Sequence, residues 1–172
     1  HAHSAVRSGN PRDDGTLMGP RIAEDAVQAV KEGVATIKQQ GGELVYGGDV
    51  IGEGPGYFVQ PTIFRSRTDM PITAEEVFAP ILHVFTVETL EEAIAVNNSV
   101  PQGLSSGLFT RSLRSAEIWL SASGADCGIA NVNAGTSAPE LGAASGGDEA
   151  TGGGRQAGRA PGKAYLPRPP AR

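Results

Sequence analysis

The feature that most constrains the fold is a regular alternation of strand-like and helix-like segments between residues 77 and 133. The strand-like segments are "VFAPILHVFTV" (77–87), "GLSSGLFT" (103–110) and "CGIANVN" (127–133), and the helix-like ones are "TLEEAIAVNNS" (89–99) and "LRSAEIWLSAS" (113–123). Strands joined through helices by short links run parallel, with right-handed crossovers. The alternation therefore predicts an α/β fold, with strands near 81–87, 103–110 and 127–133 as parallel neighbours in one sheet.

Both predicted helices begin at recognisable caps. Thr89 precedes Glu92 by three residues, which is the spacing of a capping box, and Ser112 occupies the position before the second helix. The second helix is expected to pack on the sheet through Leu113, Ala116, Ile118 and Leu120.

The N-terminal half adds one longer helix and two strands. The segment "RIAEDAVQAVKEGVATIKQQGG" (21–42) predicts an amphipathic helix that ends at its two glycines. Its apolar positions at a period near 3.6 are Ile22, Ala26, Ala29, Val30, Gly33, Val34 and Ile37. Two further segments, "ELVYGG" (43–48) and "GYFVQPTIF" (56–64), predict strands, and Pro61 places an edge or a bend in the second.

Composition excludes several classes of protein. The 172 residues suffice for one domain with a core, and the net charge of -5 argues against a broad nucleic-acid surface. No apolar run approaches the ~20 residues of a membrane helix. The single cysteine, Cys127, cannot form an internal disulfide and fits a reducing compartment, so we expect a cytoplasmic protein without nucleic-acid or membrane partners.

The two ends of the chain differ from its middle. The start, "HAHSAVRSGN" (1–10), has no Met and no signal-peptide pattern, so we expect a piece of a longer protein. After Asn133 the chain is dominated by Gly, Ala and Pro, which predicts an irregular segment. We expect a partial catalytic domain over residues 1–158 and a divergent, disordered tail over 159–172.

Several candidate sites have plainer structural explanations. The run "TGGGRQ" (151–156) lacks the Lys-Ser/Thr of a P-loop, and the three scattered histidines do not have metal-ligand spacing. Cys127 is expected to be a small buried residue, although a nucleophile is the alternative. Trp119 is expected in the core, and local turn bonding accounts for Asn97 and Asn98.

The stretch "TAEEVFAPIL" (73–82) poses a sharper question, because it places Glu75 and Glu76 beside Phe78 immediately before a strand. A carboxylate at the mouth of a buried strand is costly unless water, a polar group or a ligand satisfies it. Two interpretations stay open from the residues alone, a solvated turn and a corner that faces a cofactor.

Taken together, the motifs resemble the C-terminal part of an aldehyde dehydrogenase. "GYFVQPTIF", "EEVFAPIL", "TLEEAIAVNN", "GLSSGLFT" and "GIANVN" follow one another in the family's order, and the resemblance covers about residues 15–154. "QGLSSGLFT", "DCGIANVN", "GTSAPELG" and "TGGGRQAG" look most like the α-aminoadipic semialdehyde dehydrogenase (antiquitin) group.

The resemblance implies a cofactor site and a reaction. In the family the second glutamate of this motif hydrogen-bonds the nicotinamide ribose of NAD and the phenylalanine packs beside it, so these roles carry over to Glu76 and Phe78. The family oxidises an aldehyde by cysteine attack, hydride transfer to NAD and hydrolysis with a glutamate base. Both reacting residues lie upstream of the matching stretch, so the isolated chain is expected to be inactive, and Cys127 matches a strand cysteine.

The resemblance also implies a substrate loop. In the antiquitin group the loop matching "GTSAPELG" (135–142) anchors the charged end of a semialdehyde, which points to Thr136, Ser137 and Ala138. Pro139 removes one backbone donor from this loop, so weaker anchoring of an aminoadipate-type head group is expected.

Departures from the family pattern concentrate in the tail. Ser145 stands where the family has an aromatic residue, and Glu149 where it has lysine. The family forms homo-oligomers through a strand where this chain has Pro167, Pro169 and Pro170, which puts those contacts in doubt. The alternative function is a non-catalytic binding or subunit-interaction module derived from the same fold.

Overall fold

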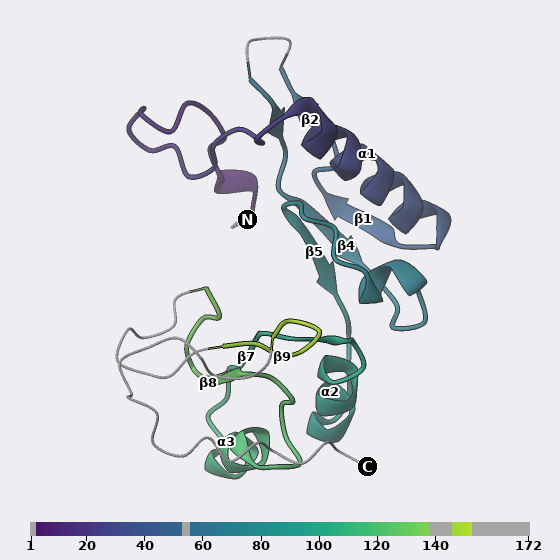
Figure 1. The fold of residues 1–172 in the computed structure, drawn as a ribbon, viewed down its shortest axis with the longest axis vertical. Coiled ribbons are helices and arrows are strands. Elements are labelled where there is room, and N and C mark those ends of the chain that lie inside the picture. The colour runs from purple at the N-terminus through teal and green to yellow at the C-terminus, as the bar shows by residue number, and fades with distance from the viewer. Residues whose placement is uncertain (1–2, 53–55, 138–145, 153–172) are drawn as a thin grey trace. The chain divides into compact units, whose positions relative to one another are not determined.

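The computed structural model describes residues 3–52, 56–137 and 146–152, and the chain divides into two compact units (Figure 1). The first unit spans residues 1–86 and the second spans residues 87–172. Each unit has its own hydrophobic cluster, and each is described by itself. The boundary expected at residue 158 lies outside the described residues.

The first unit is organised by one long helix, α1 (Glu24–Gln39), which follows a short 3-10 helix, η1 (His3–Ala5). Glu24 and Asp25 in its first turn and Lys38 in its last turn complement the helix dipole. The helix is shorter than predicted from the sequence. Ile22 lies before it and is 93 % exposed, and the buried stripe begins at Val27.

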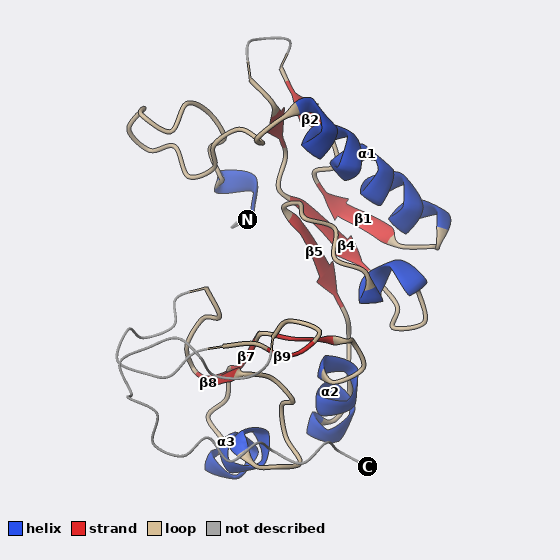
Figure 2. Ribbon diagram, in the orientation of Figure 1, coloured by secondary structure: helices blue, strands red, loops and turns tan. Residues whose placement is uncertain are grey.

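The sheet of the first unit has three strands in the order β1-β4-β5 (Figure 2). Strand β1 (Glu43–Tyr46) pairs antiparallel with β4 (Thr62–Arg65), and β5 (Ile81–Val84) pairs parallel with β4. The 3-10 helix η2 (Pro71–Ala74) lies in the connection from β4 to β5. A small ribbon joins β2 (Val50–Ile51) to β3 (Phe58–Val59). The predicted bend at Pro61 is confirmed, because β3 ends and β4 begins on either side of it.

The core of the first unit lies between α1 and the sheet. Phe64 on β4 and Ile37 on α1 are fully buried, and Val59 on β3 is nearly so. The remaining buried members of this cluster are Val27, Val30, Val34, Met70 and Ile72. The amphipathic character predicted for the helix is therefore confirmed, with its apolar stripe packed on the strands. The stripe differs from the prediction at Ala29, which is exposed, and at Val27, which is buried.

The second unit has two helices and a parallel strand pair. Helix α2 (Leu90–Asn97) precedes β7 (Ser105–Leu108), helix α3 (Leu113–Leu120) follows it, and β8 (Ile129–Val132) pairs parallel with β7. A short antiparallel pair links β6 (Gln102–Gly103) to β9 (Asp148–Glu149).

Both predicted caps of the second unit are confirmed. The Thr89 hydroxyl accepts from the Glu92 amide at 3.1 Å, and the Ser112 hydroxyl accepts from the Ser115 amide at 3.2 Å. The Glu92 carboxylate reaches back to the amide of Glu88, so the N-terminus of α2 is satisfied from both directions.

The core of the second unit is built on Trp119, which is only 4 % exposed, as expected. Ile94, Ala125 and Cys127 complete the buried cluster. The packing face predicted for α3 is partly wrong, because Leu113 and Leu120 are 76 % and 54 % exposed in this chain. The indole of Trp119 is larger than either leucine, and burying it turns the helix away from them.

The two asparagines at the end of α2 do more than form a local turn. The Asn98 side chain donates to the carbonyl of Gly124 at 2.9 Å and accepts from the amide of Asp126 at 2.9 Å. The Ser106 hydroxyl hydrogen-bonds the side-chain oxygen of Asn97. These residues therefore fasten α2 to the loop before β8 and to β7.

The prediction of one sheet containing all three later strands is wrong. β7 and β8 are parallel neighbours, as predicted, but β5 pairs with β4 in the sheet of the first unit. The α/β class stands, since each unit combines helices with a parallel strand pair. The pairing partner differs because β4, beyond the Pro61 bend, offers β5 a matching ladder from Thr62 to Arg65.

We expect Gly47→Ala to lower the free energy of unfolding by more than Gly15→Ala. Both glycines have positive φ, 75° and 80°, which costs an alanine about 1–2 kcal/mol. At Gly47 the added Cβ would also overlap the carbonyl oxygen of Pro61, whereas at Gly15 the nearest atom is 3.7 Å away. Urea denaturation of the two variants measures the difference, and equal losses would contradict the steric argument.

Candidate functional site

The first candidate site is the segment between η2 and β5. The amide of Glu75 donates to the carbonyl of Ile72 at 3.2 Å. Two tight turns follow, from the Ala79 amide to the Val77 carbonyl at 2.6 Å and from the Ile81 amide to the Ala79 carbonyl at 2.8 Å. These turns fix the conformation of the backbone that carries Glu76 and Phe78.

Val77 anchors this segment to α1. A Cβ placed on Gly33 would lie 2.9 Å from Cγ1 of Val77, so the valine occupies the space that a larger residue at position 33 would fill. Val77 packs against the core cluster, whereas its neighbours Glu76 and Phe78 are exposed, the latter to 79 %. The segment therefore directs one side chain inward and presents the two flanking ones to solvent.

Arg21 provides a second contact that holds the same segment. Its guanidinium donates to the carbonyl of Phe78, and its own amide donates to the carbonyl of Tyr57 at 2.6 Å. Sequence reasoning missed Arg21, because a contact to a backbone carbonyl 57 residues away leaves no motif. It missed the role of Gly33 as well, although a glycine on the apolar stripe of a helix is a signal of close approach.

Glu76 and Phe78 present an exposed carboxylate and an exposed ring on either side of Val77. Within the described residues, neither Glu76 nor Phe78 has a side-chain hydrogen bond or ion pair. Because Glu76 is exposed, water can satisfy it, and the burial cost raised by its position in the sequence does not arise. A free carboxylate beside a free aromatic ring can accept hydroxyl hydrogen bonds from a ligand and stack against it.

The second candidate site is the loop after β8. Thr136 and Ser137 are exposed in the second unit, and the loop that carries them is tied to β7 and β8 by side chains of both strands. Ala138 and Pro139 lie outside the described residues. Glu76 and Phe78 belong to the first unit, so the two groups of predicted site residues are described separately.

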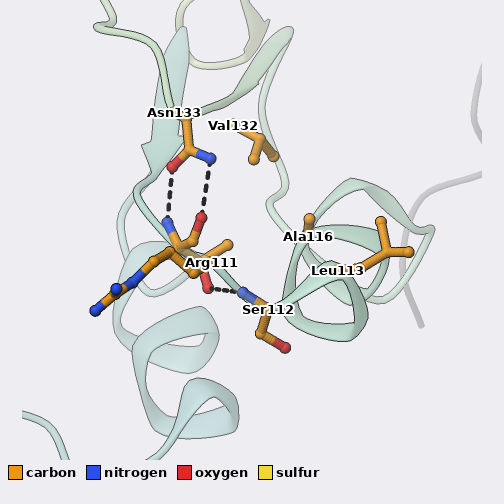
Figure 3. Close-up of a pocket in the computed structure, with 7 residues that line it drawn as sticks. Arg111, Ser112, Leu113, Ala116, Val132 and Asn133 are labelled. Carbon is orange, nitrogen blue, oxygen red and sulfur yellow. Dashed lines mark hydrogen bonds between the residues drawn. The ribbon is translucent and has the colours of Figure 1, made fainter.

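A groove of about 420 Å³ lies beside the start of α3 (Figure 3). Asn133 bonds both backbone groups of Thr110, and the Thr110 hydroxyl accepts from the Ser112 amide, so these polar groups are already used. Arg111 also lines the groove. Leu113, Ala116 and Val132 supply an apolar wall. We interpret this groove as a structural feature of the turn at Thr110 and the cap of α3, and we do not assign it a ligand.

Cys127 lies in the wall of a second cavity, of about 330 Å³, together with Ser106 and Asp126. Burial raises the pKa of its thiol, and the sulfur sits 3.2 Å from the carbonyl of Ile129. A protonated, buried thiol is a poor nucleophile. The prediction that Cys127 is a small buried residue is confirmed, since it is 7 % exposed and belongs to the cluster around Trp119.

His3 and His83 are the histidines within the described residues, and neither belongs to a cluster of metal-ligand side chains there. Within residues 3–52, 56–137 and 146–152, no three His, Cys, Asp or Glu side chains gather at a common point. His83 on β5 instead has its Nδ1 atom 2.8 Å from the buried hydroxyl of Ser66, and its ring stacks with Phe85.

Within residues 3–52, 56–137 and 146–152, the structure contains no helix long and apolar enough to cross a bilayer.

We expect stability to depend on pH through His83. Burial lowers the pKa of this imidazole below its usual value of about 6.5, so the unfolded chain binds the proton more tightly than the folded one. The free energy of unfolding should therefore fall as pH drops from about 6.5 toward the folded pKa. His83→Gln should flatten this part of the pH profile in urea titrations. His3→Gln is the control, and loss of the slope in that variant instead would contradict the assignment.

Comparison with known proteins relates this chain to the aldehyde dehydrogenases. The model of the aldehyde dehydrogenase family matches residues 1–168. Aldehyde dehydrogenase family 7 member A1 of Pisum sativum is 49 % identical over 166 residues, covering 96 % of this chain and 32 % of the relative. The α-aminoadipic semialdehyde dehydrogenase of Mus musculus is 46 % identical over 168 residues, covering 97 % and 31 %.

A solved lactaldehyde dehydrogenase structure superposes with a TM-score of 0.85 at 32 % identity, covering 92 % of this chain and 33 % of that one. The chain thus spans about a third of the length of the curated relatives it matches. The family model, the sequence relatives and the solved fold all agree, and the chain belongs to the aldehyde dehydrogenase family.

Proposed function

We propose that this chain is part of an NAD-dependent enzyme that oxidises a semialdehyde, such as α-aminoadipic semialdehyde, to the carboxylic acid. The observation that carries the proposal is the outward-facing pair Glu76 and Phe78, on a segment held by Val77 and Arg21. The similarity to family 7 member A1 and α-aminoadipic semialdehyde dehydrogenase supports the substrate class, which belongs to lysine catabolism.

Glu76 and Phe78 would form this chain's contribution to the cofactor site. A carboxylate without an internal partner accepts two vicinal ribose hydroxyls well, and an exposed ring beside it offers a flat apolar surface. NAD, when bound, supplies the hydride acceptor of the reaction. The residues of this chain would bind and orient the cofactor, and they would take no proton and form no bond.

The reacting groups would lie outside this chain. Burial raises the pKa of the Cys127 thiol and disfavours the thiolate, so we propose that another residue supplies the nucleophile that the family reaction needs. We therefore propose that the isolated chain does not turn over aldehyde, and that the nucleophile and the glutamate base come from an upstream part. We further propose that the enzyme acts in the cytoplasm and forms homo-oligomers whose contacts differ at the C-terminal end.

The loop carrying Thr136 and Ser137, with Ala138, would contact the far end of the substrate. Short side chains let a carboxylate approach backbone amides, and both described residues are exposed. This role favours a substrate with a negative charge opposite its aldehyde.

The proposal is tested by reconstruction. We expect no NADH absorbance from the isolated chain with aldehyde and NAD. We expect NADH from a chimera that joins the upstream two thirds of the Pisum sativum relative to this chain. Cys127→Ser in the chimera should leave the rate within about twofold, because a buried thiol plays no part in the chemistry.

A well-folded but inactive chimera would favour the non-catalytic interaction module instead. Turnover by the isolated chain would overturn both the partial-enzyme proposal and the structural role of Cys127.

Replacing Glu76 should weaken cofactor binding in the chimera. Glu76→Gln removes a charge-assisted acceptor, at a cost of about 1–3 kcal/mol, so the KM for NAD should rise about 5- to 100-fold. Glu75→Gln is the matched control, since the neighbouring carboxylate is also exposed and its loss should leave this KM nearly unchanged. An unaltered KM and hydride-transfer rate in Glu76→Gln would mean that Glu76 is part of a solvated turn and does not bind the cofactor.

A further inference from the structure

The β7–β8 pair has two chemically different faces. In the parallel register Ser105 lies opposite Ile129 and Gly107 lies opposite Asn131. Because side chains alternate along a strand, the intervening residues point the other way. Those that pack on the cluster around Trp119 are Leu108, Ala130 and Val132. By the same alternation the opposite face carries Ser105, Gly107 and Asn131, which are small or polar, together with Ile129.

The loop after β8 folds back onto the face that carries Ser105, Gly107 and Asn131. The Asn131 amide group donates to the carbonyl of Gly135 at 2.9 Å, and the Ser105 hydroxyl donates to the carbonyl of Thr136 at 3.3 Å. A Cβ on Gly107 would lie 3.1 Å from the carbonyl oxygen of Ala134, so the glycine allows the loop to approach closely. Three successive carbonyls of the loop thus face the strands.

The start of the loop is fixed by Asn133. This residue has a positive φ of 55° and exchanges two hydrogen bonds with the backbone of Thr110, at 2.8 Å and 2.9 Å (Figure 3). Its own amide donates to the carbonyl of Leu108 at 2.8 Å. The chain therefore leaves β8 in one direction, toward the face that carries Asn131.

The hydrogen bonds to the loop carbonyls determine the direction in which the loop amides point, because the two groups of one peptide bond face opposite ways. Within the described residues, the amide groups of Gly135, Thr136 and Ser137 donate no hydrogen bond, and all three residues are exposed. Successive exposed amides whose carbonyls are directed elsewhere form a site suited to an anion. A carboxylate is the anion that fits the substrate class proposed above.

We propose that Asn131 and Ser105 are positioning residues for the carboxylate end of the substrate. By binding the carbonyls of Gly135 and Thr136, they direct the loop amides toward the ligand without touching it themselves. This inference rests on the proposed function, because it assumes that the loop contacts a charged semialdehyde.

The test uses the chimera described above and two aldehydes of equal length, a five-carbon semialdehyde with a terminal carboxylate and pentanal. Asn131→Ala and Ser105→Ala should each raise the KM for the charged aldehyde about 3- to 10-fold, the range expected for one lost hydrogen bond. Their kcat values, and both constants for pentanal, should stay within about twofold. Ser105→Thr keeps the hydroxyl and should restore the KM.

Ser106→Ala is the matched control, because Ser106 is the next residue of β7 and its hydroxyl bonds Asn97 instead of the loop. It should not separate the two substrates. Equal losses on both aldehydes in Asn131→Ala and Ser105→Ala, or no loss, would overturn the positioning role alone. If the unmodified chimera does not prefer the charged aldehyde, the proposed substrate class fails and the inference fails with it.

Discussion

Parallel pairing of two short strands is the constraint on which each unit of this protein depends. A parallel pair sends alternate side chains to opposite faces, and a helix must cover the apolar face. In the first unit α1 covers the face that carries Phe64, and in the second the cluster around Trp119 covers the face that carries Leu108. The loops at the ends of these strands are then free to carry binding groups.

Local features of this fold could be predicted from the sequence, and sheet membership could not. The caps at Thr89 and Ser112 and the bend at Pro61 depend on neighbouring residues, so their patterns are short and specific. The partner of β5 depends on which strand lies next to it in the folded unit. The alternation of apolar and polar residues does not identify that strand. Likewise, the period of α3 does not reveal that one large indole outweighs two leucines in deciding which face is buried.

The candidate sites divide in the same way. Glu76 and Phe78 could be singled out because an acidic pair beside an aromatic residue before a strand resembles a motif of the family. Arg21, Ser105 and Asn131 could not, since each acts on a backbone carbonyl, and every residue type has one. A side chain that positions a backbone leaves no partner of definite type in the sequence.

Both sites use one device, and it suits binding better than chemistry. In each, a side-chain donor holds a main-chain carbonyl, Arg21 for Phe78 and Asn131 for Gly135, so that the adjacent exposed groups face outward in a fixed direction. Fixing a loop before the ligand arrives lowers the entropy lost on binding, which improves affinity without requiring a reactive group. Under the proposed function, a segment built in this manner would contribute mainly to cofactor and substrate affinity. The reacting cysteine and base would then reside on a separate part of the enzyme, whose own geometry would set the rate of the chemical step.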